Sequence, residues 1–256
     1  MQYHLCTKAL PRNSFIKVAN GICVSSPELL FFQLSNIYSI EQMMYIGMEM
    51  CGTYSIFKSN TSNFTSNIIP LTTPERINNF LNSLKNYVKH TNGLLKAINA
   101  AKYLESNAAS PQESKLYLML CAPRKYGGYG IKNLKLNYKI TLSQKATDIL
   151  GYKTIRPDLS NPSKKIAIEY DSTAYHENAN QNKHDKLRLN AFQNDGWKLL
   201  SFVPNVLSNE KAFDAMAIKI LKLNNQDARI KTKGFYDKKH NLWKILKTMD
   251  RMQMNA

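Results

Sequence analysis

The sequence predicts an α/β fold, and two observations carry that prediction. From Ser110 onward the pattern is one helix, several short strands, a helix, a strand and another helix, which is typical of an α/β unit. The last of these helices, at residues 211–223, has an apolar stripe that can cover a sheet. The stripe consists of Phe213, Met216, Ala217, Ile220 and Leu221.

The first 72 residues are expected to form a smaller, mixed α+β region. Short β-like pieces occupy residues 15–18 and 22–25, and helix-like stretches begin at Pro27 and at Ser39. The second helix-like stretch has three apolar side chains at roughly helical spacing, which indicates a core face. These are Met43, Ile46 and Met50, and we interpret the methionines as packing residues.

Residues 73–106 are expected to form a helical connector. Thr73 is the predicted cap of its first helix, with Pro74 in the first turn, where the missing N–H of proline costs nothing. A second helix is predicted from Gly93 to about Ser106.

The rest of the chain is expected to comprise the α/β unit, at residues 107–223, and a basic tail, at residues 224–256. Residues 222–256 carry nine Lys or Arg against three Asp. The whole chain of 256 residues has 35 Lys plus Arg against 18 Asp plus Glu, a net charge of +17. Such an excess attracts polyanions, so DNA is the leading candidate partner. The alternative explanation of the charge is base bias in the coding DNA, which would also give a Lys- and Asn-rich sequence.

Several classes of protein are disfavoured. With 43% hydrophobic and 21% charged residues, the chain has enough apolar material to fold. Its start lacks the apolar stretch of a signal peptide and no apolar run is long enough to span a bilayer, so we expect a soluble, cytoplasmic protein without membrane contacts. The cysteines have no spacing suited to zinc or a redox dithiol, and we expect them to be reduced and buried. They are Cys6, Cys23, Cys51 and Cys121.

The most informative segment is residues 156–171. Its centre is rich in turn-forming residues and its second half in β-branched and apolar residues, which predicts a β-hairpin. A fold-back centred between Ser163 and Lys164 places Asp158 opposite Glu169, because both are equally far from the centre.

Acidic side chains are expected to gather on one face of this hairpin. Side chains alternate along a strand, so Glu169 and Asp171 share a face, and Asp158 joins them across the ladder. Carboxylates a few ångströms apart need a neutralising cation. Oxygen ligands suit Mg²⁺ or Mn²⁺, so we expect one of these metals.

A purely structural interpretation of the same residues is open. Asp158 could cap a turn, and Glu169 with Asp171 could be the solvated face of an edge strand. Against it, Ala167 shares the acidic face while apolar residues fill the other, so the strand is expected to be buried on both sides. Buried acids need a partner.

Five motifs follow one another in order over residues 106–210. They are Ser110-Pro111-Gln112-Glu113, Pro157-Asp158-Leu159, Ile166 to Ser172 with His176, Asp185 to Asn190, and Gly196-Trp197 to Phe202. As a set, at compatible spacing, they resemble endonuclease-like domains related to the very-short-patch mismatch-repair endonuclease, of the PD-(D/E)XK superfamily.

This resemblance implies a restriction-endonuclease-like core, a mixed central sheet flanked by helices, that hydrolyses phosphodiesters with a bound divalent metal. Asp158 and Glu169 would be metal ligands, with the Tyr170 carbonyl as a third oxygen. Asp171 stands where the broader superfamily often has Lys, although the related subgroup also carries Asp here. The change removes a cation that could stabilise the pentavalent phosphate.

Other candidate site residues each have two interpretations. Ser110 and Glu113 form a capping box, but the resemblance also brings Glu113 to the edge of the site, where it could hold metal or a metal-bound water. His176 could be a general acid, a phosphate contact or a surface histidine.

Several basic residues are expected to contact phosphate. Arg188 lies within one helical turn of His184 and Asp185, so it could bind a phosphate or form an ordinary Asp–Arg surface pair. His184 is a candidate nucleic-acid contact in the same turn. Four lysines, at the hairpin turn and in the tail, are further candidates for phosphate contacts. These are Lys164, Lys165, Lys238 and Lys239.

The function expected from all of this is that of a metal-dependent DNA endonuclease, in phage defence or in processing of mobile DNA. A double-strand cut needs two sites, so a homodimer is a reasonable expectation. The first hundred residues resemble, more faintly, the part that precedes this module in proteins related to abortive-infection antitoxins, although the winged helix usual there is not visible. The alternative is therefore a catalytically inactive DNA-binding protein or an antitoxin-like transcriptional regulator.

Overall fold

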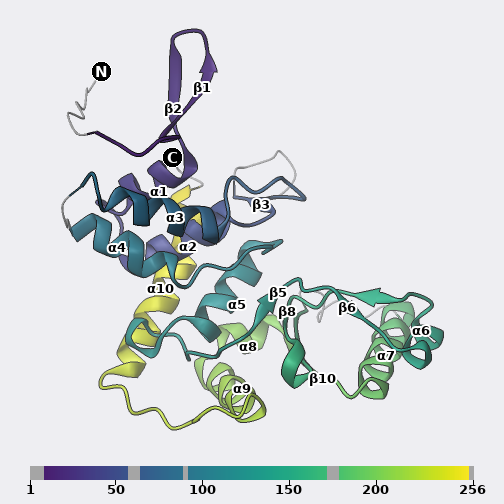
Figure 1. Ribbon diagram of the computed structural model, residues 1–256. Helices are drawn as coiled ribbons and strands as arrows, with labels where there is room; N and C mark the ends of the chain where they lie inside the picture. The colour runs from purple at the N-terminus through teal and green to yellow at the C-terminus, as the bar shows by residue number, and fades with distance from the viewer. Residues whose placement is uncertain (1–8, 57–63, 89–91, 172–178, 254–256) are drawn as a thin grey trace. The chain divides into compact units, whose positions relative to one another are not determined.

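The computed structural model describes residues 9–56, 64–88, 92–171 and 179–253 (Figure 1). The chain divides into two compact units. The first contains residues 1–106 together with 244–256, and the second contains residues 107–243. The division after Ser106 falls at the end of the expected helical connector, whose helices pack in the first unit rather than between the two.

The first unit begins with a β-hairpin followed by a small group of helices. The hairpin pairs Phe15 with Ser25 and turns at Gly21, whose φ of +74° favours glycine. The elements are β1 (Phe15–Ala19), β2 (Ile22–Ser25), α1 (Pro27–Leu34), α2 (Ile40–Met50), β3 (Tyr54–Ser55), β4 (Thr65–Ser66), α3 (Pro74–Leu84) and α4 (Asn92–Ala101).

Local capping sets the helix starts in this unit. Ser39 and Gln42 form a full capping box at the start of α2, and the Thr73 hydroxyl accepts from the backbone N–H of Arg76 at the start of α3. Both starts confirm the sequence prediction. Met43, Ile46 and Met50 are buried, which confirms the predicted core face. The predicted helix to Ser106 was too long: α4 ends at Ala101, where Tyr103 donates to the Ala100 carbonyl in a turn.

The second unit alternates helices and strands, which confirms the α/β class. Its elements are α5 (Pro111–Cys121), β5 (Lys135–Leu136), β6 (Ile140–Thr141), α6 (Gln144–Leu150), β7 (Thr154–Ile155), β8 (Leu159–Asn161), β9 (Ile166–Tyr170), α7 (Ala179–Asn194), β10 (Lys198–Phe202), α8 (Pro204–Ser208) and α9 (Glu210–Leu223). The last helix, α10 (Phe235–Gln253), starts in this unit, and its part from Lys244 onward is grouped with the first.

The central sheet of the second unit is mixed. Its strand order is β10-β9-β8-β5, with β9 parallel to β10 and antiparallel to β8, which in turn is antiparallel to β5. A parallel pair needs a long crossover, and α7 supplies it between β9 and β10. The sheet therefore places the end of β9 beside both α7 and the start of β8.

Both faces of β9 are covered. On one face, Ala167 packs in a cluster with α6 and α7. The members are Ile140, Leu142, Ala146, Ile155, Ala167, Ala191, Phe192 and Trp197. Ile166 and Ile168, which alternate to the other face, are fully buried as well. β9 is thus an interior strand, as the sequence predicted: residues 166–168 are buried, and Glu169 and Tyr170 at its end are half-buried.

None of the helices in the described ranges has the length and apolar character needed to cross a membrane.

The cysteines differ in their burial. Cys51 is buried as expected, whereas Cys121 is half-buried and Cys23 is exposed on β2, so the expectation of buried cysteines was wrong for these two. Cys23 lies on the β1–β2 hairpin, where side chains on both faces are exposed. Cys6 lies outside the described residues.

Candidate active site at the β8–β9 hairpin

The predicted fold-back of the hairpin is confirmed. Leu159 pairs with Ile168 in the antiparallel ladder, so the next position along places Asp158 opposite Glu169. The turn is a single 3-10 turn, Pro162–Lys164, and Lys165 reverses the chain with a φ of +48°. This tight turn sets the register of the hairpin. A slip of one residue would move the acids to the other face.

Asp158 lies where three strands meet. Its Oδ2 accepts a hydrogen bond of 2.7 Å from the backbone N–H of Tyr170, and its carbonyl accepts one of 2.9 Å from Asn137, which follows β5. Burial raises the pKa of the Asp158 carboxyl above its usual range, while the Tyr170 N–H and the charge of Arg188 oppose that rise. Asp158 therefore does not act as an exposed turn cap.

Glu169 is neutralised by an arginine. Arg188, on α7, donates from Nη2 to Oε1 of Glu169, and both side chains are largely buried. Arg188 is thus placed at the acidic site and not in an exposed surface pair. Its Nε is buried and has no hydrogen-bond partner within the described part of the chain. The side chains of His184 and Asp185, its expected neighbours, lie outside the described residues.

Glu113 has the expected capping role and also lies near the acidic site. It completes the start of α5: Ser110 Oγ accepts from the Glu113 N–H at 3.2 Å and donates to Oε1 at 2.9 Å, while Oε2 accepts from the Ala109 N–H at 2.9 Å. Burial raises the pKa of Glu113, and the charge of Asp158 raises it further. The carboxylate is therefore a cap that also lies within electrostatic reach of Asp158.

Asn137 joins these two acids, although no pattern in the sequence identified it as a site residue. Its backbone N–H donates to Asp158, and its Nδ2 donates to Glu113 Oε2 at 2.5 Å and to the Asn107 carbonyl at 2.8 Å. The φ of +48° at Asn137 is typical of asparagine in a turn. That turn was recognisable from the residue type, but the partners 21 and 24 residues away were not.

The expected convergence of three carboxylates is not what the structure shows. Among the described residues, no three His, Cys, Asp or Glu side chains lie close enough to hold a metal. Arg188 binds Glu169, and the oxygens of Glu113 are taken up by its capping contacts. The Asp171 N–H continues the pairing with β10 by donating to the Phe202 carbonyl. His176 lies outside the described residues.

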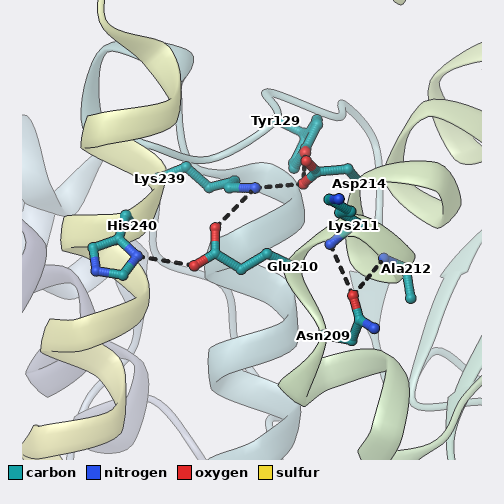
Figure 2. A network of polar contacts seen from close by, with 8 residues as sticks. All are labelled: Tyr129, Asn209, Glu210, Lys211, Ala212, Asp214, Lys239 and His240. Carbon is teal, nitrogen blue, oxygen red and sulfur yellow. Dashed lines mark hydrogen bonds and ion pairs between the residues drawn. The ribbon is translucent and has the colours of Figure 1, made fainter.

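The four candidate lysines differ in their surroundings. Lys164, Lys165 and Lys238 are exposed, and Lys165 also donates from Nζ to the Asp195 carbonyl at 2.8 Å. Lys239 is only 4% exposed. Its Nζ contacts Asp214 Oδ1 at 2.6 Å and Glu210 Oε2 at 3.2 Å, as Figure 2 shows.

Lys239 belongs to a polar network that joins α10 to α9. The Tyr129 hydroxyl donates to Asp214, and His240 Nδ1 lies 2.9 Å from Glu210 Oε1 (Figure 2). The expected phosphate contact by Lys239 is therefore wrong for this fold. Counting charges in the sequence could not distinguish Lys238, which is exposed, from Lys239, which faces inward.

The expected basic tail is not a separate arm. Residues 224–243 belong to the second unit, where Asn161 Nδ2 donates to Asn224 Oδ1 at 2.6 Å. Arg124 donates to the carbonyls of Asp227 and Arg229 at 2.7 and 2.8 Å. Truncation after Leu223 would therefore remove part of the unit's own packing and not simply a DNA-binding extension.

Comparison with known proteins adds no relative to this picture: no family model, no curated protein and no solved structure matches the chain.

Proposed function

We propose that this protein is a metal-dependent endonuclease that hydrolyses phosphodiester bonds of DNA, with Mg²⁺ or Mn²⁺ at Asp158 and Glu169. One observation carries the proposal: the hairpin register places these two acids opposite each other at the end of an interior strand. Burial disfavours the ionised form of Asp158 even with the charge of Arg188 nearby, so an acid at this position is better explained by chemistry than by stability.

The residues present fit a hard divalent cation in the type of donor they offer. Asp158 and Glu169 supply carboxylate oxygens, and the Tyr170 carbonyl is directed to the same side as its N–H, which bonds to Asp158. A metal on Glu169 would compete with Arg188, which is bound to one of its two carboxylate oxygens. When bound, the metal would polarise the scissile phosphate and lower the pKa of the attacking water.

The surroundings of the site also support a polyanionic substrate. The second unit carries 23 Lys or Arg against 12 Asp or Glu. Exposed Lys164 lies at the hairpin turn, and Arg188 is a guanidinium at the acids themselves. Such groups position a phosphate backbone without reading its sequence. The mixed sheet flanked by helices agrees with the restriction-endonuclease-like core that the motifs led us to expect.

We place this activity in the cytoplasm, in phage defence or processing of mobile DNA, with a homodimer as the form that could cut both strands.

A second function is favoured by a specific observation. The ion pair between Arg188 and Glu169 already neutralises Glu169, and Asp171 stands where a catalytic Lys would be expected. A protein that keeps this core as a DNA-binding module or antitoxin-like regulator, without turnover, would show salt-sensitive DNA binding that survives loss of either acid.

Plasmid cleavage decides between the two functions. Supercoiled plasmid is incubated with the wild type, Asp158→Asn, Glu169→Gln and the exposed control Asp237→Asn, with and without Mg²⁺. We expect Mg²⁺-dependent nicking or linearisation by the wild type and the control, and a loss of about a hundredfold or more in the two site variants. Equal cleavage by all four proteins, or none by the wild type, contradicts the nuclease proposal.

A further inference from the structure

Arg188 is bound to one of the two carboxylate oxygens that Glu169 could offer to a metal. Its Nη2 is bound to Oε1 of Glu169, and its charge also acts on Asp158, so a single guanidinium serves both acids of the candidate site. It reaches them from α7, the crossover helix between β9 and β10. Arg188 is thus a counter-cation for both acids of the site.

A divalent ion and the Arg188 guanidinium would compete for the same carboxylates. Two cations a few ångströms apart on the same carboxylates repel each other, and Oε1 of Glu169 cannot serve Arg188 and a metal without weakening one bond. A metal that binds Asp158 and Glu169 therefore competes with Arg188 for the Glu169 carboxylate. Without another anion to receive it, the displaced guanidinium would be left partly buried and unpaired, which is unfavourable.

Arg188 is incompletely satisfied where it lies. A guanidinium has five N–H donors in a planar fork, and the buried Nε of Arg188 has no hydrogen-bond partner within the described residues. A phosphate offers two or more oxygens that match this fork better than a single carboxylate oxygen does. A DNA phosphate at the site would supply the anion that makes the exchange favourable.

We propose that Arg188 is an exchangeable counter-cation, which holds Glu169 in the free protein and transfers to a backbone phosphate when DNA and a divalent metal bind together. This inference rests on the proposed function. It makes Arg188 a positioning residue whose movement couples the two ligands. Because such coupling is reciprocal, DNA strengthens metal binding by the same factor as metal strengthens DNA binding.

The coupling predicts how a variant without the charge behaves. Arg188→Gln removes the guanidinium that competes for Glu169, so the free protein should bind Mn²⁺ more tightly than the wild type does. DNA should then add little, because no guanidinium remains to be displaced. Arg188→Lys keeps a charge but loses the planar fork, so it should fall between the two. Lys186→Gln, an exposed change on the same helix, is the matched control.

The experiment measures bound Mn²⁺ from the loss of the free-ion electron paramagnetic resonance signal. The full chain is titrated alone and with a short cleavage-resistant phosphorothioate duplex, and ions bound by the duplex itself are subtracted with the Asp158→Asn, Glu169→Gln double variant. For the wild type and Lys186→Gln, we expect DNA to strengthen Mn²⁺ binding by about fivefold or more, within the usual range of such couplings. For Arg188→Gln, we expect Mn²⁺ binding without DNA to be tighter than in the wild type by a similar factor and to change less than about twofold with DNA.

The outcomes separate the two proposals. If the wild type binds Mn²⁺ but neither Arg188→Gln nor Arg188→Lys changes its affinity or its response to DNA, the exchange is wrong while the metal site stands. If no protein binds more Mn²⁺ than the double variant, the metal site proposed above fails and the exchange fails with it. Circular dichroism melts of each variant show that the comparison is between folded proteins.

Discussion

Oδ2 of Asp158 accepts a hydrogen bond of 2.7 Å from the backbone N–H of Tyr170, across the end of the β8–β9 ladder. This contact fixes the carboxylate at the junction of β5, β8 and β9, beside Glu113 and facing the charge of Arg188. The fold therefore maintains a buried acid at a cost in stability, which is typical of residues retained for function.

The first prediction concerns stability against pH. The pKa of Asp158 is raised in the folded state, so its contribution to stability is fully present below the unfolded pKa and is lost as pH rises through the raised value. Asp158→Asn removes that dependence while its side-chain oxygen can still accept from Tyr170. The melting temperature of the variant minus that of the wild type should therefore increase from pH 4 to pH 8.

Added Mg²⁺ should offset the stability that the wild type loses at high pH. Added Mg²⁺ is expected to raise the melting temperature of the wild type at pH 8 and to leave that of Asp158→Asn almost unchanged. A difference between the two proteins that stays flat from pH 4 to pH 8 would show that Asp158 is not buried as a charged group.

A second prediction concerns Ser160, two residues beyond Asp158 on the same face of β8. Its hydroxyl is fully buried and has no hydrogen-bond partner among the residues that the structure describes. Ser160→Ala should raise the free energy of unfolding in urea by roughly 1 kcal/mol, because an unpaired buried hydroxyl is costly. Ser201→Ala, an exposed change on β10, should stay within about 0.5 kcal/mol. Destabilisation by Ser160→Ala would mean that the hydroxyl has a partner.

A third prediction separates two adjacent lysines. Lys239→Met removes the ammonium between Asp214 and Glu210 and should lower the free energy of unfolding by about 2 kcal/mol, less than for a fully buried pair because Glu210 is 40% exposed. Lys238→Met, on the exposed side of α10, should change it by less than about 0.5 kcal/mol. Urea titration measures both, and similar losses for the two variants would contradict the network in Figure 2.

A fourth prediction concerns DNA affinity. Lys164→Gln and Lys238→Gln should each weaken binding to duplexes of any sequence and reduce the slope of log affinity against log salt by about 1, the change expected for one lost phosphate contact. Fluorescence anisotropy at several salt concentrations measures this. An unchanged slope in either variant would remove that lysine from the DNA-binding surface.

The sequence predicted the features that local rules determine. The caps at Thr73 and Ser110, the hairpin register that pairs Asp158 with Glu169, and the burial of β9 on both faces all follow from residues close together in the chain. Turn chemistry and the alternation of side chains are sufficient for such features.

The sequence could not predict contacts that depend on packing between distant elements. Arg188 reaches Glu169 from a helix 19 residues further along, and Asn137 joins Glu113 to Asp158 from a turn after β5. Charge alone also could not show that Lys239 faces inward. Each of these positions is determined by how a helix or loop lies against the sheet, which no local pattern specifies.

The most direct test of the account is a crystal structure of the full chain bound to a cleavage-resistant phosphorothioate duplex and soaked with Mn²⁺, in which anomalous scattering locates the ion. We predict one Mn²⁺ bound by carboxylate oxygens of both Asp158 and Glu169, with the guanidinium of Arg188 no longer on Glu169. A saturating soak that leaves these acids without an ion, or that places Mn²⁺ elsewhere while Arg188 stays on Glu169, would contradict the proposed metal site.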